Sequence, residues 1–144
     1  MRTTRTVKKG LKLKTLSKLK AEAWKLLSEI VRRTNADKFG RCRCVTCGVV
    51  SEWKAMHAGH AIGGRKASTL FDEDIIYPQC PTCNIWKGGA YGEFAAFLIR
   101  KHSLLWYEQK QEASRKVVKL TRMEVEDKII SYTRRLEIIR GEQH

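Results

Sequence analysis

The sequence predicts a small α+β protein in which helices flank a cysteine- and histidine-rich centre. Two observations support this fold class. Apolar residues recur at helical spacing in two segments, one near the start of the chain and one close to its end. Between them lie two Cys-x-x-Cys pairs, short runs typical of strands, and glycine-containing turns. Hydrophobic residues make up 42% of the 144 residues, so the predicted core is modest in size.

We divide the chain into four parts: a basic flexible arm over 1–15, an N-terminal helix over 16–40, a central core over 41–90 and a C-terminal helical region over 91–144. The first helix has Ser17 as a candidate N-cap and should end near Asn35. A weaker helical pattern covers Leu104–Lys116. The last helix begins with Thr121 and Glu124, which are spaced as a capping box.

Strands are predicted in the central part. Residues Arg41–Trp53 suggest a hairpin with Gly48 in its turn, and Lys54–Ile62 suggest a strand that carries His57 and His60. Four residues on apolar faces are expected in the core: Phe94, Phe97, Tyr132 and Ile139. Trp53 and Trp86 have two interpretations, stacking on unpaired bases or packing in the core, and their spacing favours the core.

The charge of the chain indicates a polyanionic partner. The net charge is +14, from 29 Lys and Arg against 15 Asp and Glu, and nucleic acid is the commonest partner of such a protein. No apolar run approaches the roughly 18 residues that span a bilayer, and the first residues lack the apolar segment of a secretory signal. Four of the five cysteines form Cys-x-x-Cys pairs, which favours a reducing compartment. We therefore expect a cytoplasmic protein without a membrane segment.

The two Cys-x-x-Cys pairs predict one structural zinc ion. Each pair turns the backbone so that two thiolates converge on a tetrahedral ion, and the predicted ligands are Cys44, Cys47, Cys80 and Cys83. Four sulfurs leave no open coordination position, so this zinc would hold the fold and not catalyse. Disulfides or unrelated buried thiols are the alternative. Cys42 is either a spare thiol, which we favour, or an alternate ligand.

A histidine-rich strand lies between the two cysteine pairs. It reads His57-Ala58-Gly59-His60, while Asn84 follows the second pair and Lys87 lies three residues further on. This order resembles the HNH, or ββα-metal, nucleases. The resemblance implies a treble-clef zinc finger with a ββα-metal centre, in which His60 is the general base that activates water and Asn84 is a ligand of catalytic Mg²⁺ or Mn²⁺.

The chemistry is coherent, because neutral imidazole accepts a proton near pH 7 and a divalent cation stabilises charge on a phosphate. Two positions depart from the pattern. Gly59 stands where many HNH nucleases have an acidic ligand, and Ile75 stands where an Asn is expected. The residues that could compensate are Asp72, Glu73, Asp74 and His57, and we name Asp74 and His57 as further catalytic candidates. The structural alternative is that His60 merely packs within the hairpin.

A second resemblance covers most of the chain. The segment Trp53–Lys87, which includes Ala58-Gly59-His60 and Gln79-Cys80-x-x-Cys83-Asn84, is similar to the NinG family of lambdoid phages, as are Ser17–Trp24 and Val118–Arg122. In this family a glycine before the histidine is expected. The resemblance implies a structure-specific DNA endonuclease that nicks Holliday junctions and D-loops in the cytoplasm of a bacterial host cell. Phage or host recombination proteins are further candidate partners.

Branched DNA is recognised by shape and phosphate, so basic residues are the candidate contacts. They are Arg2, Arg5, Lys8, Lys9, Lys12, Lys14, Arg65, Lys66 and Lys87. Each of them taken singly is better explained as a solvated surface charge. The last helix packs either on the first helix or on a second protomer, and a homodimer would suit a four-way junction. Two other functions stay open: a non-catalytic DNA-binding finger with a degenerate HNH site, and an RNA-binding or protein-scaffolding zinc ribbon.

Overall fold

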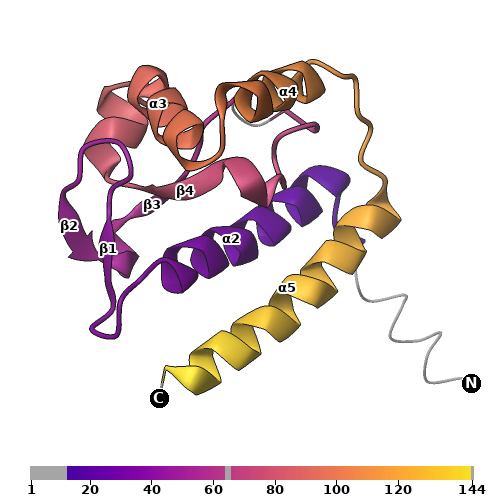
Figure 1. Cartoon of the computed structure of the whole chain (residues 1–144). Helices are drawn as coiled ribbons and strands as arrows, with labels where there is room; N and C mark the ends of the chain where they lie inside the picture. The colour runs from indigo at the N-terminus through magenta and orange to yellow at the C-terminus, as the bar shows by residue number, and fades with distance from the viewer. Residues whose placement is uncertain (1–12, 64–65, 144) are drawn as a thin grey trace, which may run out of the picture.

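A computed structural model describes residues 13–63 and 66–143 of the chain. Its main elements, in order, are α2 (Leu16–Thr34), β1 (Arg41–Arg43), β2 (Val50–Glu52), β3 (His57–His60), β4 (Ile76–Gln79), α3 (Tyr91–Lys101), α4 (Leu104–Ser114) and α5 (Arg122–Glu142). Short helical turns lie between them: η1 (Trp53–Ala55), η2 (Glu73–Ile75) and η3 (Thr82–Trp86). The predicted α+β class is confirmed, with helices on both sides of small sheets (Figure 1).

Helix α2 begins two residues earlier than a Ser17 cap would allow. The Thr15 side chain accepts a hydrogen bond from the backbone N–H of Lys18 at 3.2 Å, while Ser17 already lies inside the helix. The prediction of Ser17 as N-cap was therefore wrong, because the cap needs the extended backbone that Thr15 has. At the other end Asn35 closes the helix and donates from its side chain to the Val31 carbonyl at 2.7 Å. The stretch from 35 to 40 forms turns and not helix.

Helix α5 lies along α2, so the first and last helices share one hydrophobic core (Figure 1). The capping box of Thr121 and Glu124 is present as predicted. Tyr132 and Leu136 are buried in the same cluster as Leu27 of α2. Of the two packings left open for the last helix, packing on the first helix is the one observed.

Two antiparallel hairpins form the centre. Strand β1 pairs with β2, and Gly48 in the loop between them has φ +82°, a backbone conformation that favours glycine. Strand β3 pairs with β4, with His57 opposite Gln79 and His60 opposite Ile76. The β3–β4 hairpin packs against α2, and η3 follows β4 directly.

The aromatic side chains separate into core and surface. Phe94 and Tyr132 are buried, and Phe97 packs partly buried against the same cluster, which confirms their predicted core positions. Trp53 is half-buried beside the cysteine cluster. Trp86 is 83% exposed, so its predicted place in the core was wrong. Trp86 is the last residue of η3. In this turn Cys83 is the buried residue, so the Trp86 ring points to solvent.

Candidate metal centre and adjoining hollows

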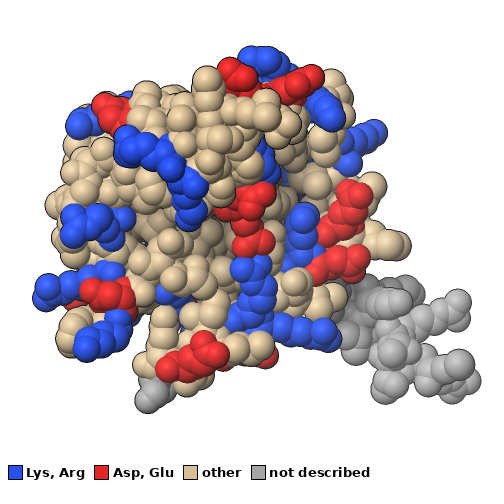
Figure 2. Space-filling view, viewed as in Figure 1, with Lys and Arg blue, Asp and Glu red and all other residues tan. Residues whose placement is uncertain are grey.

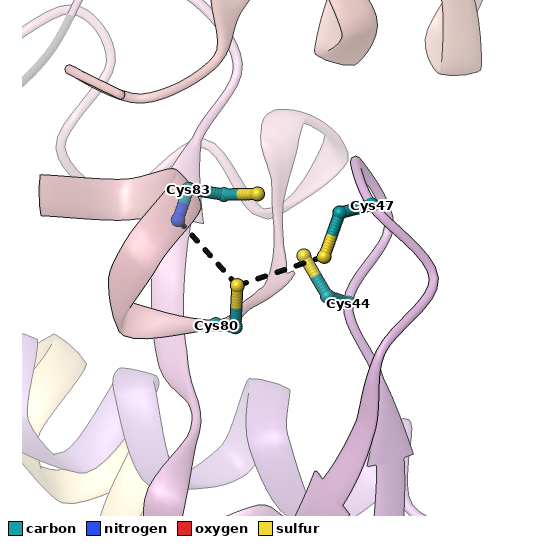
Figure 3. A group of neighbouring side chains, drawn as sticks. All are labelled: Cys44, Cys47, Cys80 and Cys83. Carbon is teal, nitrogen blue, oxygen red and sulfur yellow. Dashed lines mark hydrogen bonds between the residues drawn. The ribbon is translucent and has the colours of Figure 1, made fainter. Parts of the chain in front are cut away.

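Four cysteines from two distant segments converge on one point. Cys44 and Cys47 lie in the loop between β1 and β2, whereas Cys80 and Cys83 lie at the end of β4 and in η3 (Figure 3). All four sulfur atoms lie within 4.8 Å of one another. The backbone N–H of Cys83 also points at the Cys80 sulfur, at 3.4 Å. The four cysteines are therefore positioned to bind a metal ion, as the spacing predicted.

The thiols of this cluster differ in acidity. Burial raises the pKa of Cys83 to about 12. Burial also opposes ionisation of Cys44, but hydrogen bonds from the Thr46 hydroxyl and nearby backbone N–H groups outweigh it and lower the pKa to about 6. Without a metal ion, the surrounding protein groups thus favour a thiolate at Cys44 and a thiol at Cys83. A bound cation is what allows four thiolates to lie together.

Cys42 does not belong to the cluster. Its side chain is fully buried and its Sγ donates to the Arg32 carbonyl at 2.9 Å. Burial raises the pKa of this thiol, so it stays protonated. The interpretation of Cys42 as a spare thiol is confirmed, because the metal-ligand grouping in the described residues omits it.

His60, on β3, contacts α2 and the segment between β3 and β4. The ring is 8% exposed and stacks on Trp24 of α2, with centroids 4.7 Å apart. Its Nε2 lies 3.1 Å from the Leu70 carbonyl oxygen. A carbonyl only accepts, so Nε2 carries the hydrogen and, in the neutral ring, Nδ1 is the basic nitrogen.

His57 and Asn84 are brought together although they are 27 residues apart. The side-chain amide of Asn84 donates from Nδ2 to the Nδ1 of His57 at 3.0 Å. These two residues line a hollow of about 370 Å³ with Trp24, Arg32 and Lys54, which we call the His57 hollow. A smaller hollow of about 150 Å³, the His60 hollow, is lined by His60, Asn84 and Tyr91 among others. The two hollows share Trp24, Ala58 and Asn84, so they adjoin. His57 lines one, His60 lines the other, and Asn84 lines both.

The acidic candidates are engaged elsewhere. Lys110 binds Asp74 at 2.8 Å and Asp72 at 3.1 Å, and Arg135 binds Glu73 at 2.8 Å. None of these carboxylates lines the His57 or the His60 hollow. Ile75 is buried in the core. Of the four residues considered as compensation for Gly59 and Ile75, His57 is therefore the one that contacts Asn84.

The predicted DNA contacts fall into two groups. Six lie outside the described residues: Arg2, Arg5, Lys8, Lys9, Lys12 and Arg65. Lys14 pairs with Glu22 at 2.9 Å, and Lys87 is exposed directly after η3. Lys66 lines a hollow of about 240 Å³ with Arg115 and Lys116. Figure 2 shows lysine and arginine side chains spread over the visible face with acidic groups between them.

Sequence reasoning gave no role to three residues that line the His57 hollow. Trp24 and Arg32 come from α2, and Lys54 comes from η1. Arg32 could have been proposed as a site residue from the sequence, because it lies in the basic last turn of the helix. Trp24 and Lys54 could not be assigned before α2 was placed against β3, because they meet only across that packing.

Fold and site together define an α+β protein with a four-cysteine metal site beside a hollow lined by histidine and asparagine. The model of the family described as Bacteriophage Lambda NinG protein matches residues 2–142. The chain belongs to the NinG family, as its resemblance predicted. No curated protein and no solved structure matches the chain. Among the helices of the described ranges, none has the length and apolar character needed to cross a membrane.

Proposed function

We propose that this protein is a metal-dependent DNA endonuclease that nicks branched recombination intermediates such as Holliday junctions and D-loops. The observation that carries the proposal is that His57 and His60 line two adjoining hollows that share Asn84, which follows the cysteine cluster. Membership of the NinG family supports it, since the HNH-like residues lie within the matched segment. The net charge of +14 suits a polyanionic substrate.

Zinc fits the four-cysteine cluster. A tetrahedron of sulfurs at about 2.3 Å from zinc has edges of about 3.8 Å, and the Cys47 and Cys80 sulfurs lie 3.7 Å apart. The cysteines come from a hairpin loop and from the start of a helical turn, which is the arrangement of a treble-clef finger. A closed set of four thiolates gives the metal a structural role. Bound there, zinc would tie η3, and with it Asn84, to the loop between β1 and β2.

A second, catalytic cation fits His57 and Asn84. An imidazole nitrogen and an amide oxygen are suitable donors for Mn²⁺ and, through the oxygen, for Mg²⁺. The Asn84 amide already meets His57 Nδ1 at 3.0 Å, and rotation of the amide turns its oxygen to the same point. Bound there, a divalent cation would stabilise charge on the phosphate. His57 would thus take the ligand role that Gly59 leaves vacant.

His60 would act as the general base. The Leu70 carbonyl holds the hydrogen on Nε2 and Trp24 fixes the ring plane, which directs Nδ1 as the proton acceptor. A water that loses its proton to Nδ1 forms a new bond to phosphorus. The bond from phosphorus to the leaving sugar oxygen then breaks, and that oxygen takes up a proton.

A cleavage assay tests the proposal. Labelled four-way junction, D-loop and linear duplex of matched sequence are incubated with the protein and Mg²⁺ or Mn²⁺. We expect nicks in the branched substrates and few in the duplex. Binding without cleavage under any divalent ion would instead identify a non-catalytic finger. Absence of DNA binding would favour an RNA-binding or scaffolding role.

A further inference from the structure

A further hollow lies beside the proposed nuclease site and has no role in it. Its volume is about 730 Å³, and it lies between the end of α2, the turn before β1, η1 and the end of α5. We call it the Phe39 hollow; Arg33, Lys38, Phe39, Trp53 and Lys54 are among its lining residues.

Phe39 is presented to solvent by a rigid turn. Its side chain is 74% exposed, although a large aromatic ring gains free energy when it is buried. The Asp37 carboxylate accepts hydrogen bonds from the backbone N–H groups of Phe39 at 2.8 Å and Arg41 at 3.0 Å. Gly40 donates to the Asp37 carbonyl at 3.0 Å and has φ +78°. Because the turn is already ordered, little conformational entropy is lost when a ligand stacks on Phe39.

Arg33 and Trp53 form the opposite wall of the hollow, and contacts between side chains hold this wall in place. The Arg33 guanidinium lies 4.2 Å from the centre of the Trp53 ring. The same guanidinium donates to the Gln143 side chain at 2.6 Å, which ties the wall to the end of α5. Lys38 also lies 5.1 Å from the Phe39 ring. The hollow therefore combines an exposed aromatic face with three cations, Arg33, Lys38 and Lys54, and two carboxylates. The Asp37 carboxylate is turned toward its own backbone, and the second belongs to the exposed Glu142 at the end of α5. The cations exceed the carboxylates by one.

The Phe39 hollow leads to the proposed nuclease site. Lys54 lines both the Phe39 hollow and the His57 hollow. Arg32, the neighbour of Arg33 on α2, lines the His57 hollow and approaches the Trp53 carbonyl at 3.5 Å. Basic side chains thus run from Phe39 past Arg33, Lys54 and Arg32 to His57 and Asn84. Arg33 is also paired with Glu29 at 3.0 Å, so Lys54 and Arg32 supply most of the charge on this path.

We propose that the Phe39 hollow binds an unpaired base of a single-stranded DNA segment whose backbone follows these cations into the His57 hollow. Within a duplex both faces of a base are covered by its neighbours, whereas an unpaired base exposes a face that can stack on Phe39. Stacking of this kind tolerates any base, because each has a π face. The inference rests on the proposed nuclease function and adds that, among branched substrates, those that carry a single-stranded arm bind more tightly.

Binding measurements without added divalent ion test the inference independently of cleavage. Fluorescence anisotropy compares a four-way junction that carries a short single-stranded arm with the same junction fully paired. For Phe39→Ala we expect a loss of roughly 5- to 150-fold in affinity for the armed junction, the range of one base–aromatic stack. Phe39→Leu should lose most of this, since it keeps an apolar side chain but no ring. Affinity for the paired junction should stay within about twofold.

Met123→Ala is the matched control. Met123 is a 72% exposed apolar side chain on α5, roughly 28 Å along the helix from Glu142 at 1.5 Å per residue. This variant should bind both junctions like the wild type. Thermal unfolding checks that every variant is folded. Equal losses for both junctions, or no loss for either, would overturn the inference. Tighter binding of an RNA arm than of the DNA arm would overturn the choice of DNA.

The two proposals can fail separately. If the wild type cuts no substrate but Phe39→Ala loses armed-junction binding selectively, the nuclease proposal fails and the base site stands. If the wild type cuts junctions and Phe39→Ala binds and cuts both forms normally, the base site alone is wrong.

Discussion

The side-chain amide of Gln79 occupies the space beside Gly59 that a β-carbon would fill. A β-carbon built at Gly59 would lie 1.9 Å from Gln79 Oε1 and 2.7 Å from its Cδ. Gln79 cannot easily leave, because its Nε2 donates to the Gly89 carbonyl at 2.8 Å and to the Thr46 hydroxyl at 3.2 Å. The acidic residue that many HNH nucleases carry before the histidine therefore has no room here.

Gly59→Ala should destabilise the protein by about 1–3 kcal/mol, because the added methyl group overpacks a filled site. Urea denaturation of the zinc-loaded protein measures this change. Gly92→Ala is the control, since a β-carbon there meets nothing within 4 Å and alanine favours the helix. The double variant Gly59→Ala with Gln79→Ala should recover part of the loss at position 59. A Gly59→Ala variant as stable as the wild type would show that the Gln79 side chain can move aside without lowering the free energy of unfolding.

Metal analysis should find one tightly bound zinc ion per chain. Cys80→Ser should lose the metal and unfold, because structural zinc contributes about 10–16 kcal/mol in small finger peptides, comparable to the whole stability of a domain. Cys42→Ser is the control and should keep the metal, since Cys42 lies outside the cluster. Metal content and circular dichroism are the measurements. Normal folding of Cys80→Ser would refute the structural role.

His60→Ala should lower the cleavage rate on branched DNA by about 10²- to 10⁴-fold, the usual contribution of a general base. Its affinity for the junction should stay unchanged, which anisotropy measures. Because the ring is buried against Trp24, His60→Gln serves as a second variant that fills more of the space. His57→Ala should instead raise the Mn²⁺ concentration needed for cleavage. Normal cutting by both His60 variants would show that the base assignment is wrong.

Affinity for junction DNA should fall steeply with salt, because lysine and arginine side chains that bind phosphate release counterions. Deletion of residues 1–12 removes the basic residues of the arm that we expect to bind DNA: Arg2, Arg5, Lys8, Lys9 and Lys12. The plot of log affinity against log salt should then become shallower by about 0.9 for each phosphate that the shortened protein no longer neutralises. An unchanged slope would exclude the arm from binding, and a flat response of the full chain would remove the electrostatic argument.

Stability should fall at alkaline pH through Tyr132. Burial, with the nearby charge of Glu73 adding to it, raises the pKa of Tyr132 from 10.0 to about 12. The folded state thus holds the phenol proton more tightly, so the stabilisation is complete below pH 10 and is lost as the pH rises toward 12. Between pH 9 and pH 11 the wild type should lose about 1 kcal/mol more than Tyr132→Phe in urea denaturation. Equal losses would show that Tyr132 ionises freely in the fold.

Much of the metal centre and the helix ends could be read from local sequence. A Cys-x-x-Cys pair shapes its own turn, so the four cysteines were assigned before any tertiary contact was known. The capping box of Thr121 and Glu124 is likewise complete within four residues. Even here the prediction of Ser17 as N-cap failed, because the hydroxyl of Thr15 can cap as well and only the backbone conformation decides.

The environment of the candidate site was decided by tertiary structure alone. The Leu70 carbonyl that orients His60, the Lys110 ammonium that holds Asp72 and Asp74, and the Gln79 amide that fills the space at Gly59 all come from distant positions. Whether the Trp86 ring is buried depends on which elements pack over η3. The spacing of apolar residues in the sequence does not predict this packing. The sequence by itself determined which residues can ligate a metal or take a proton; the packing of α2 and η3 on β3 determined which of them meet, because distances between remote side chains exist only in the folded chain.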